Sequence, residues 1–116
     1  MLKISISQIK VYHNLEKNLS KIKDFIKASK GELVIFPELA LTGYKVPFSS
    51  FSQKNIDSAL SEIQDLANTY KKHILIGAPF YENGQIYNAV YLVSPQKTKV
   101  LAKKFLLFPE IDNPFS

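Results

Sequence analysis

The chain has 116 residues, a formal net charge of +5 and no cysteine. This length supports one domain with a hydrophobic core and is too short for two, so we expect a single domain over residues 1–116. Without cysteine there is no disulfide and no thiolate metal site. The two histidines, His13 and His73, stand at unrelated positions, so the sequence predicts no zinc site and places both on the surface.

The positive charge does not indicate a nucleic-acid partner. All 15 basic residues are lysines, and arginine, which makes bidentate contacts to guanine and phosphate, is missing. No apolar run approaches the roughly 20 residues that a membrane-spanning helix needs, and the first residues alternate in character, whereas a signal peptide carries an apolar block. We therefore expect a soluble, cytoplasmic chain that binds neither nucleic acid nor membrane.

The first part of the chain predicts a strand, a helix and a second strand. Residues 2–9 alternate between apolar and polar side chains, which is typical of a strand with Leu2, Ile4 and Ile6 on one side. Asn14 suits the N-cap of a helix whose apolar residues recur every three and four positions. Residues 33–36 are apolar without alternation, which favours a short strand covered on both faces. The right-handed crossover of such a unit makes its two strands parallel.

The second part predicts one more helix and three more strands. Asn83-Gly84 is a dipeptide that favours a tight hairpin, and Pro95 marks a second turn. The expected order is β-α-β-α-β-β-β, an α/β fold. The expected helix covers residues 56–70, and the expected strands cover residues 74–80, 86–93 and 99–104.

Glu38 follows Pro37 directly after the strand at residues 33–36. In an open α/β sheet, ligands bind beyond the carboxyl ends of the parallel strands, which is where Glu38 stands. One interpretation is a solvated charge at a strand end. The apolar residues on both sides favour another, in which desolvation raises the carboxyl pKa toward the value that a general base requires. Tyr44, after the turn at Gly43, is a candidate pocket residue, with simple packing as the alternative.

Five segments resemble one family. "LVIFPELALTGY" resembles the glutamate motif of the nitrilase or carbon-nitrogen hydrolase superfamily. "ISISQIKVYHNLEKNLSKI" resembles its first strand and helix, with Gln8 and Asn18 in the polar pattern. "ILIGAPF", "GQIYNAVYLVS" and "AKKFLLF" resemble its third strand, its "YN-A" strand and its lysine motif. The segments come in the family's order, and they look closest to glutamine-amidase domains such as that of NAD synthetase, and to the ω-amidase and carbamoylase branches.

This resemblance implies the N-terminal half of a four-layer α-β-β-α sandwich. It also implies hydrolysis of a non-peptide carbon-nitrogen bond in a small-molecule amide by a Glu-Lys-Cys triad, without cofactor or metal. Glu38 would be the general base, and Lys104 would stabilise the oxyanion. The alternative is that Lys104 is a solvated surface lysine, like its neighbour Lys103. Of the two, Lys103 is the one expected in solvent. Asn88 is expected to bond nearby backbone groups and support the loop that carries Glu38.

The sequence departs from the family at the nucleophile. The chain has no cysteine, no serine has the context of a nucleophile elbow, and Glu110 does not align with confidence to the family's second acid. We therefore expect a chain that is inactive alone and exposes one sheet face to a second copy or a complementary C-terminal half. A non-catalytic interaction module or pseudoenzyme is an alternative. An unrelated βαβ ligand-binding domain is another, and it predicts that Glu38 and Lys104 lie far apart.

Overall fold

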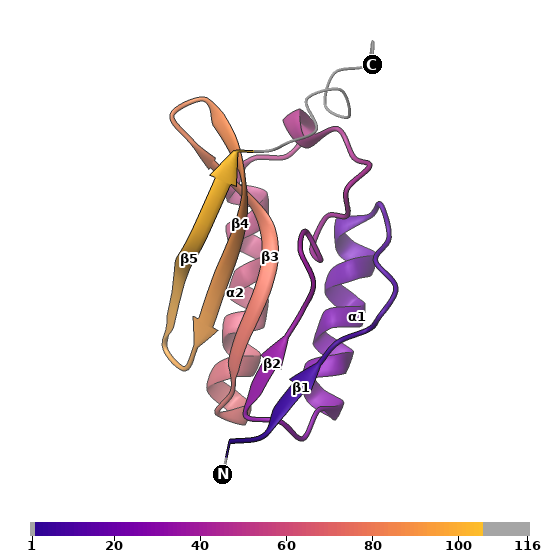
Figure 1. Ribbon diagram of the computed structural model, residues 1–116, viewed down its shortest axis with the longest axis vertical. Helices are drawn as coiled ribbons and strands as arrows, with labels where there is room; N and C mark the ends of the chain where they lie inside the picture. The colour runs from indigo at the N-terminus through magenta and orange to yellow at the C-terminus, as the bar shows by residue number, and fades with distance from the viewer. Residues whose placement is uncertain (1, 106–116) are drawn as a thin grey trace.

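The computed structural model describes residues 2–105, which form one sheet covered by helices (Figure 1). Among these residues, no helix has both the length and the apolar character that a membrane crossing requires. The predicted order of elements is confirmed, with one short 3₁₀ helix added. The elements are β1 (Ile4–Ile6), α1 (Leu15–Ala28), β2 (Leu33–Ile35), η1 (Phe48–Ser50), α2 (Gln53–Tyr70), β3 (His73–Glu82), β4 (Gln85–Ser94) and β5 (Lys97–Phe105).

The strands lie in the sheet in the order of the sequence, β1-β2-β3-β4-β5. The first three are parallel to one another, as the helical crossovers require, and β3, β4 and β5 pair as antiparallel hairpins. The turn between β3 and β4 has positive φ at both central residues, 51° at Asn83 and 76° at Gly84. This is the geometry that the Asn-Gly pair predicts, because its twist matches that of the strands.

Both long helices begin with side-chain caps. The Asn14 carboxamide oxygen accepts a hydrogen bond from the Lys17 backbone N–H at 2.9 Å, which confirms the predicted start of α1. α2 begins at Gln53, earlier than expected. The reason is the Asn55 side chain, which accepts from the Ser52 N–H at 2.8 Å and so satisfies a donor ahead of the first apolar residue.

The first strand is shorter than expected, since β1 covers only Ile4–Ile6 rather than residues 2–9. It is an edge strand whose one partner is β2, and β2 itself offers only three paired positions, Leu33 to Ile35. The alternating pattern continues beyond these positions, and the backbones of Lys3 and Ser7 still bond to the β2 segment, but no further ladder pairs form.

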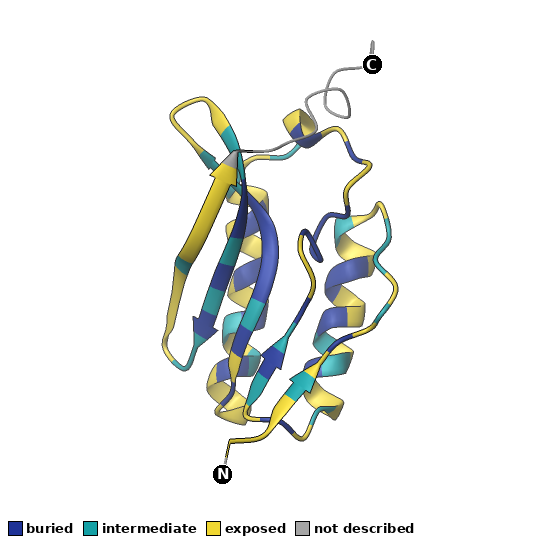
Figure 2. Cartoon of the chain, in the orientation of Figure 1, coloured by how far each residue is buried: buried dark blue, intermediate teal, exposed yellow. Residues whose placement is uncertain are grey.

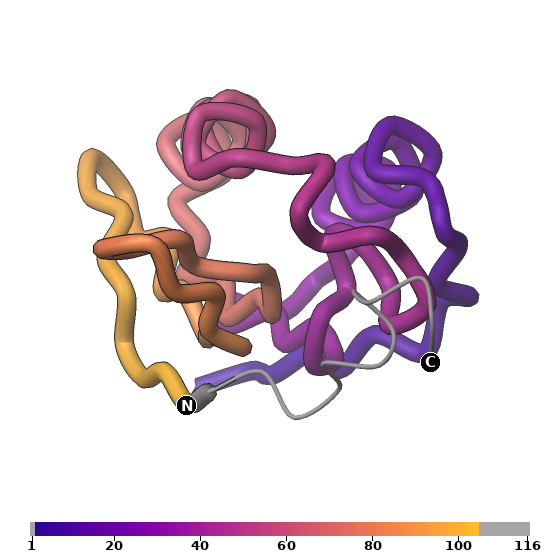
Figure 3. Tube along the Cα trace, turned by 90° about the horizontal axis from the view of Figure 1, so that it is seen from above, coloured from indigo at the N-terminus to yellow at the C-terminus, as the bar shows by residue number. Residues whose placement is uncertain are grey.

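The two helices pack on the same face of the sheet, as the end-on view shows (Figure 3). The core lies between them and the strands, and Figure 2 shows the buried residues gathered along this layer. Ile22 and Ile26 of α1, Ile63 of α2, Val34 of β2 and Ile76 of β3 are completely buried there. Apolar helix stripes facing an apolar sheet face account for the fold of this half.

The other side of the sheet, here called the open face, is not covered by any described helix. Ladder pairing joins Ile6 to Ile35, Ile35 to Leu75, and Leu75 to Leu92, so these four side chains lie in a row across four strands. Ile6 is 66% exposed. The prediction that residues 33–36 form a strand covered on both faces is therefore wrong for the described part of the chain, because the helices protect only one of them.

Candidate active site

Glu38 lies in a loop that leaves the end of β2 and packs against β3. The loop, residues 37–44, is here called the acidic loop. It passes directly over Gly77 of β3, where an added Cβ would lie 2.4 Å from the Leu39 nitrogen and 2.7 Å from the Glu38 Cα. Real side chains do not fit at such distances, so a glycine is needed at this position. This close approach places the Glu38 backbone against β3, from where its side chain reaches Asn88 of β4 and Lys104 of β5.

The apolar residues of the acidic loop point into the protein and leave the carboxylate outside. Leu39 and Leu41 are completely buried, whereas the Glu38 side chain is 44% exposed. Two hydrogen bonds close the loop, from Leu41 N–H to the Gly77 carbonyl at 3.2 Å and from Gly43 N–H to the Leu39 carbonyl at 2.7 Å. The apolar sequence around Glu38 is thus an anchor for the loop and does not surround the carboxylate.

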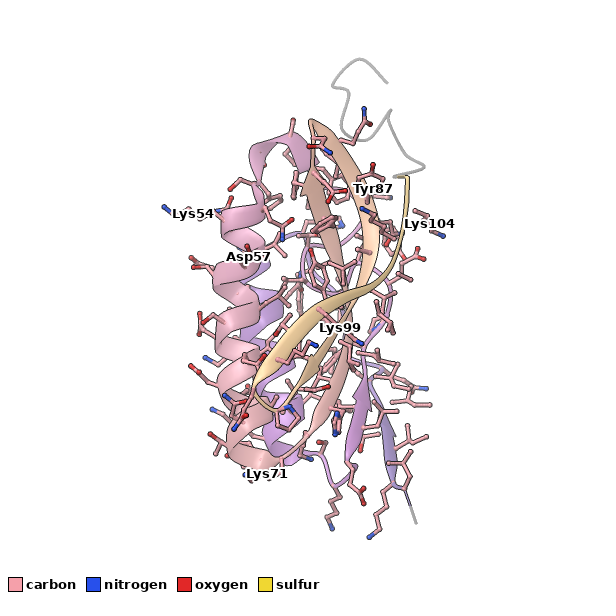
Figure 4. All side chains as sticks on the ribbon, turned by 90° about the vertical axis from the view of Figure 1, so that its left-hand side faces the viewer. Lys54, Asp57, Lys71, Tyr87, Lys99 and Lys104 are labelled. Carbon is pink, nitrogen blue, oxygen red and sulfur yellow. The ribbon has the colours of Figure 1, made fainter. Side chains whose placement is uncertain are left out.

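Lys104 of β5 meets Glu38 on the open face. Its ammonium nitrogen lies 3.5 Å from a Glu38 carboxylate oxygen, and the Lys104 side chain is 57% exposed. Lys104 is the cross-strand partner of Asn88 on β4, whose side chain also bonds the Glu38 carboxylate. Figure 4 shows Lys104 on the side of the sheet away from α2. This proximity contradicts the interpretation of an unrelated βαβ domain, which predicts the two residues far apart.

Tyr44 closes the other side of the carboxylate. Its hydroxyl donates a hydrogen bond to a Glu38 oxygen at 3.2 Å. Burial, together with the negative charge of Glu38 and this hydrogen bond, raises the pKa of Tyr44 above its ordinary value, so the hydroxyl keeps its proton and remains a donor. Among the described residues, Glu38, Tyr44, Asn88 and Lys104 therefore form one polar cluster.

The expected rise in the pKa of Glu38 is wrong. Burial does raise the pKa, but the hydrogen bonds from Asn88 and Tyr44 and the charge of Lys104 together outweigh it, so the pKa lies below the ordinary value of a glutamate. The physical reason is the exposure of the carboxylate, since its apolar neighbours in sequence turn away from it. At neutral pH the carboxylate is ionised and able to accept a proton.

Lys103 lies on the opposite face of β5 from Lys104. It forms an ion pair with Glu82 at 2.5 Å and lies over the Phe80 ring, with its nitrogen 5.0 Å from the ring centre. The side chain is 38% exposed. The expectation that Lys103, rather than Lys104, is the lysine in solvent is therefore wrong: Lys104 is the more exposed of the two, at 57%, and Lys103 is held by Glu82 and the Phe80 ring.

Two contributions to this cluster were missed in the sequence. Asn88 bonds the Glu38 side chain directly, where bonds to nearby backbone were expected, and the signal for this was its position opposite Lys104 in the hairpin. Gly77, a glycine within an apolar strand, is a recognised sign of close backbone approach. Glu110 lies outside the described residues. His13 and His73 are exposed, as expected, and residues 2–105 contain no group of three side chains suited to a metal ion.

Comparison with known proteins gives consistent matches. The chain matches the carbon-nitrogen hydrolase family over residues 3–115. A protein N-terminal amidase of Schizosaccharomyces pombe is 31% identical, over 65% of this chain and 31% of the relative. The match to the NitN amidase of Nesterenkonia sp. AN1 has a TM-score of 0.72 at 24% identity and covers 90% of this chain and 44% of that one.

A glutamine-dependent NAD(+) synthetase from Cytophaga hutchinsonii is also similar, with a TM-score of 0.65 at 24% identity over 84% of this chain and 18% of that one. The chain thus spans less than half the length of the relatives described here. These structural likenesses establish that residues 2–105 have the fold of part of a nitrilase-type domain. The match over residues 3–115 shows that the chain belongs to the carbon-nitrogen hydrolase family.

Proposed function

We propose that this chain supplies the base and the oxyanion-stabilising cation of an amide hydrolase, with Glu38 and Lys104 in those roles. The observation that carries the proposal is the 3.5 Å approach of the two side chains, one from the acidic loop and one from β5, in a member of a family of carbon-nitrogen hydrolases. The thiol nucleophile of the proposed reaction comes from another polypeptide segment, since residues 1–116 contain no cysteine. A Nesterenkonia amidase with the same fold is described as reacting at an active-site cysteine.

In the proposed reaction, Glu38 takes the proton of the incoming thiol, and the thiolate attacks the carbonyl carbon of the amide. The carbonyl oxygen becomes negatively charged, and the Lys104 ammonium stabilises it. Glu38 then gives its proton to the leaving nitrogen as the carbon-nitrogen bond breaks. Water, activated by Glu38, hydrolyses the resulting thioester. Loss of one donor to such an oxyanion typically lowers kcat by about 10²–10³-fold.

The exposure of the cluster supports a partner on the open face. Glu38 and Lys104 both lie there, on the same face as the apolar row that ends at the exposed Ile6. Because uncovered apolar surface marks interaction sites, we propose that the complementary part of a carbon-nitrogen hydrolase packs on this face. The 44% coverage of the Nesterenkonia amidase favours this occupant over a second copy of the chain. Such packing would remove water from Glu38 and move its pKa upward, toward the range useful to a general base.

The direct test is reconstitution. The 116-residue chain is mixed with the polypeptide encoded immediately downstream of it, in which the proposal predicts the cysteine, and ammonia release from small amides is measured. We expect hydrolysis by the mixture, with Glu38→Gln and Lys104→Met each reducing kcat by at least 10²-fold. Lys103→Met is the matched control, because Lys103 lies on the other face of the same strand. A complex that forms but releases no ammonia would contradict the proposal.

A non-catalytic interaction module is the second candidate, and the lack of cysteine in the chain favours it. This function needs the open face and does not need the polar cluster. It predicts that Leu75→Lys, in the centre of the open face, abolishes association with the second polypeptide, whereas Glu38→Gln leaves both association and biological activity unchanged. Sedimentation velocity of the chain, alone and mixed, separates self-association from binding of the second polypeptide.

A further inference from the structure

Asn18 is a buried polar residue that the proposed reaction does not use. It lies in the second turn of α1, and its side chain is only 1% exposed. Its carboxamide oxygen accepts a hydrogen bond from the Tyr12 N–H at 2.6 Å. Its amide nitrogen donates to the carbonyls of Tyr12 at 2.6 Å and Leu41 at 3.1 Å. One side chain thus ties the segment before α1 to the acidic loop.

The same two segments also touch through their backbones. Gly43 has a φ of 82°, and an added Cβ there would lie 2.8 Å from the Tyr12 carbonyl oxygen. Within the acidic loop, Leu39 adopts a φ of 50°, which is uncommon for a residue other than glycine. Such a conformation persists only where the surroundings hold it, and the bond from Asn18 to Leu41 lies two residues away. The acidic loop therefore has a strained backbone and a specific restraint on it.

We propose that Asn18 is a positioning residue of the site: its amide holds the acidic loop against the segment before α1, and so keeps Glu38 within reach of Lys104 and Tyr44. The catalytic meaning of this role rests on the proposed function, but the positioning itself does not. A buried amide that makes three bonds to backbone from two different segments is suited to fixing one loop conformation.

The test follows Glu38 directly. Its carboxyl carbon is titrated by NMR in the full chain and in Asn18→Leu, which keeps the branched shape and the number of heavy atoms of the side chain, adds no charge and removes all three bonds. Ile63→Ala is the control, because it removes buried apolar volume from α2 and leaves every hydrogen bond of Asn18 in place. The groups that face Glu38 are Asn88, Tyr44 and Lys104.

We expect the pKa of Glu38 to rise toward its ordinary value in Asn18→Leu and to stay unchanged in Ile63→Ala. An unchanged pKa in both variants would overturn the proposal, and so would equal rises in both, since general loosening would then explain the effect. Neither readout involves amide hydrolysis, so failure here is distinct from failure of the proposed function.

Hydrogen exchange of the unmutated chain provides a second measurement in case Asn18→Leu does not fold. The Tyr12 amide bonds the Asn18 side chain, and the Gly43 amide bonds within the acidic loop. If Asn18 holds the loop, both amides open in one event and their protection factors agree within tenfold. Protection of Gly43 that exceeds that of Tyr12 by more than tenfold would overturn the proposal, because the loop would then stay closed after the Asn18 bond had opened.

Discussion

The two faces of the sheet differ both in what covers them and in what they carry. On the helix face, Val34, Ile74 and Ile76 are completely buried and contribute to one continuous core. On the open face, apolar side chains remain exposed, and the polar cluster around Glu38 lies beside them. The difference teaches that the described residues obtain their stability from one side of the sheet and present their candidate chemistry on the other.

The two edge strands of the sheet are protected against pairing with another chain, so the open face is the more accessible surface for a partner. β1 is only three residues long, and β5 carries four lysines, Lys97, Lys99, Lys103 and Lys104. Short edge strands and edge lysines are features that discourage pairing with another chain. A partner is therefore expected to approach through the open face rather than by adding a strand to an edge.

The largest expected effect compares neighbouring residues of β3 that point to opposite faces. Ile76→Ala removes a completely buried side chain, and we expect it to lower the free energy of unfolding by about 2–5 kcal/mol. Leu75→Ala, at a half-buried position on the open face, is expected to lower it by less, about 1–2 kcal/mol, because the side chain is already partly exposed to water. Urea denaturation followed by circular dichroism measures both values.

Equal losses in the two variants would break the comparison. They would mean that Leu75 is covered in solution, for example by a second copy of the chain. In that case the loss for Leu75→Ala should grow with protein concentration, because dissociation and unfolding are coupled.

Gly77→Ala tests the close contact between the backbone of the acidic loop and β3. The added methyl group meets backbone rather than a flexible side chain, so we expect a loss of about 1–3 kcal/mol, as for other overpacked sites. We also expect the pKa of Glu38 to rise, because the loop must lift away from Asn88 and Lys104. Gly84→Ala is the control: it is strained by its positive φ, but it has no atom within 4 Å and lies outside the loop. A Glu38 pKa that is unchanged in Gly77→Ala would show that the loop tolerates the methyl group.

Local patterns predicted most of the fold. The spacing of apolar residues in α1, the cap at Asn14 and the turn at Asn83-Gly84 are short-range signals, and each leads directly to the observed element. The length of β1 was not predictable in this way, because it depends on how many positions its neighbour offers. Coverage of residues 33–36 was misjudged for a related reason, since an apolar run does not reveal whether one or both faces are occupied.

The candidate site was only partly predictable. The resemblance to a family pointed to Glu38 and Lys104, and the hairpin placed Asn88 opposite Lys104. The pKa of Glu38 could not be inferred from its apolar neighbours, because the direction in which each side chain points depends on how the acidic loop packs against Gly77 of β3. That packing is a tertiary contact, which no local pattern encodes.

Lys30 and Lys72 each lie shortly after the end of a helix, but Lys30 is exposed and Lys72 is buried. This contrast yields the next prediction. Lys72 is buried beneath the end of α1, where its ammonium donates to the carbonyls of Ser29 at 2.7 Å and Gly31 at 2.9 Å. Lys72→Met leaves these acceptors without a partner, so we expect a loss of about 1–3 kcal/mol in thermal or urea unfolding. Lys30→Met, at an exposed position nearby, should change stability by less than about 0.5 kcal/mol. Similar values for both would show that water replaces the Lys72 bonds.

The smallest effect expected is the pH dependence of the open-face ion pair. The pKa of Glu38 is lower in the folded chain than its ordinary value, so the ionised carboxylate stabilises the fold at pH values above the unfolded pKa. This contribution is lost as the pH falls through the folded pKa. Because both partners are largely exposed, we expect Glu38→Gln to lower stability at pH 7 by about 0–1 kcal/mol. The difference from the unmutated chain should shrink in acid.

A double-mutant cycle separates the ion pair from the other bonds of Glu38. In the Lys104→Met background, Glu38→Gln no longer breaks an ion pair and leaves an amide oxygen that can accept from Asn88 and Tyr44, so its effect at pH 7 should be smaller than in the unmutated chain. The coupling between the two positions should also weaken with added salt, because the open face leaves the pair accessible to solvent ions. A coupling that salt does not change would mean that the pair is shielded in solution, and the open face would then have to be covered already.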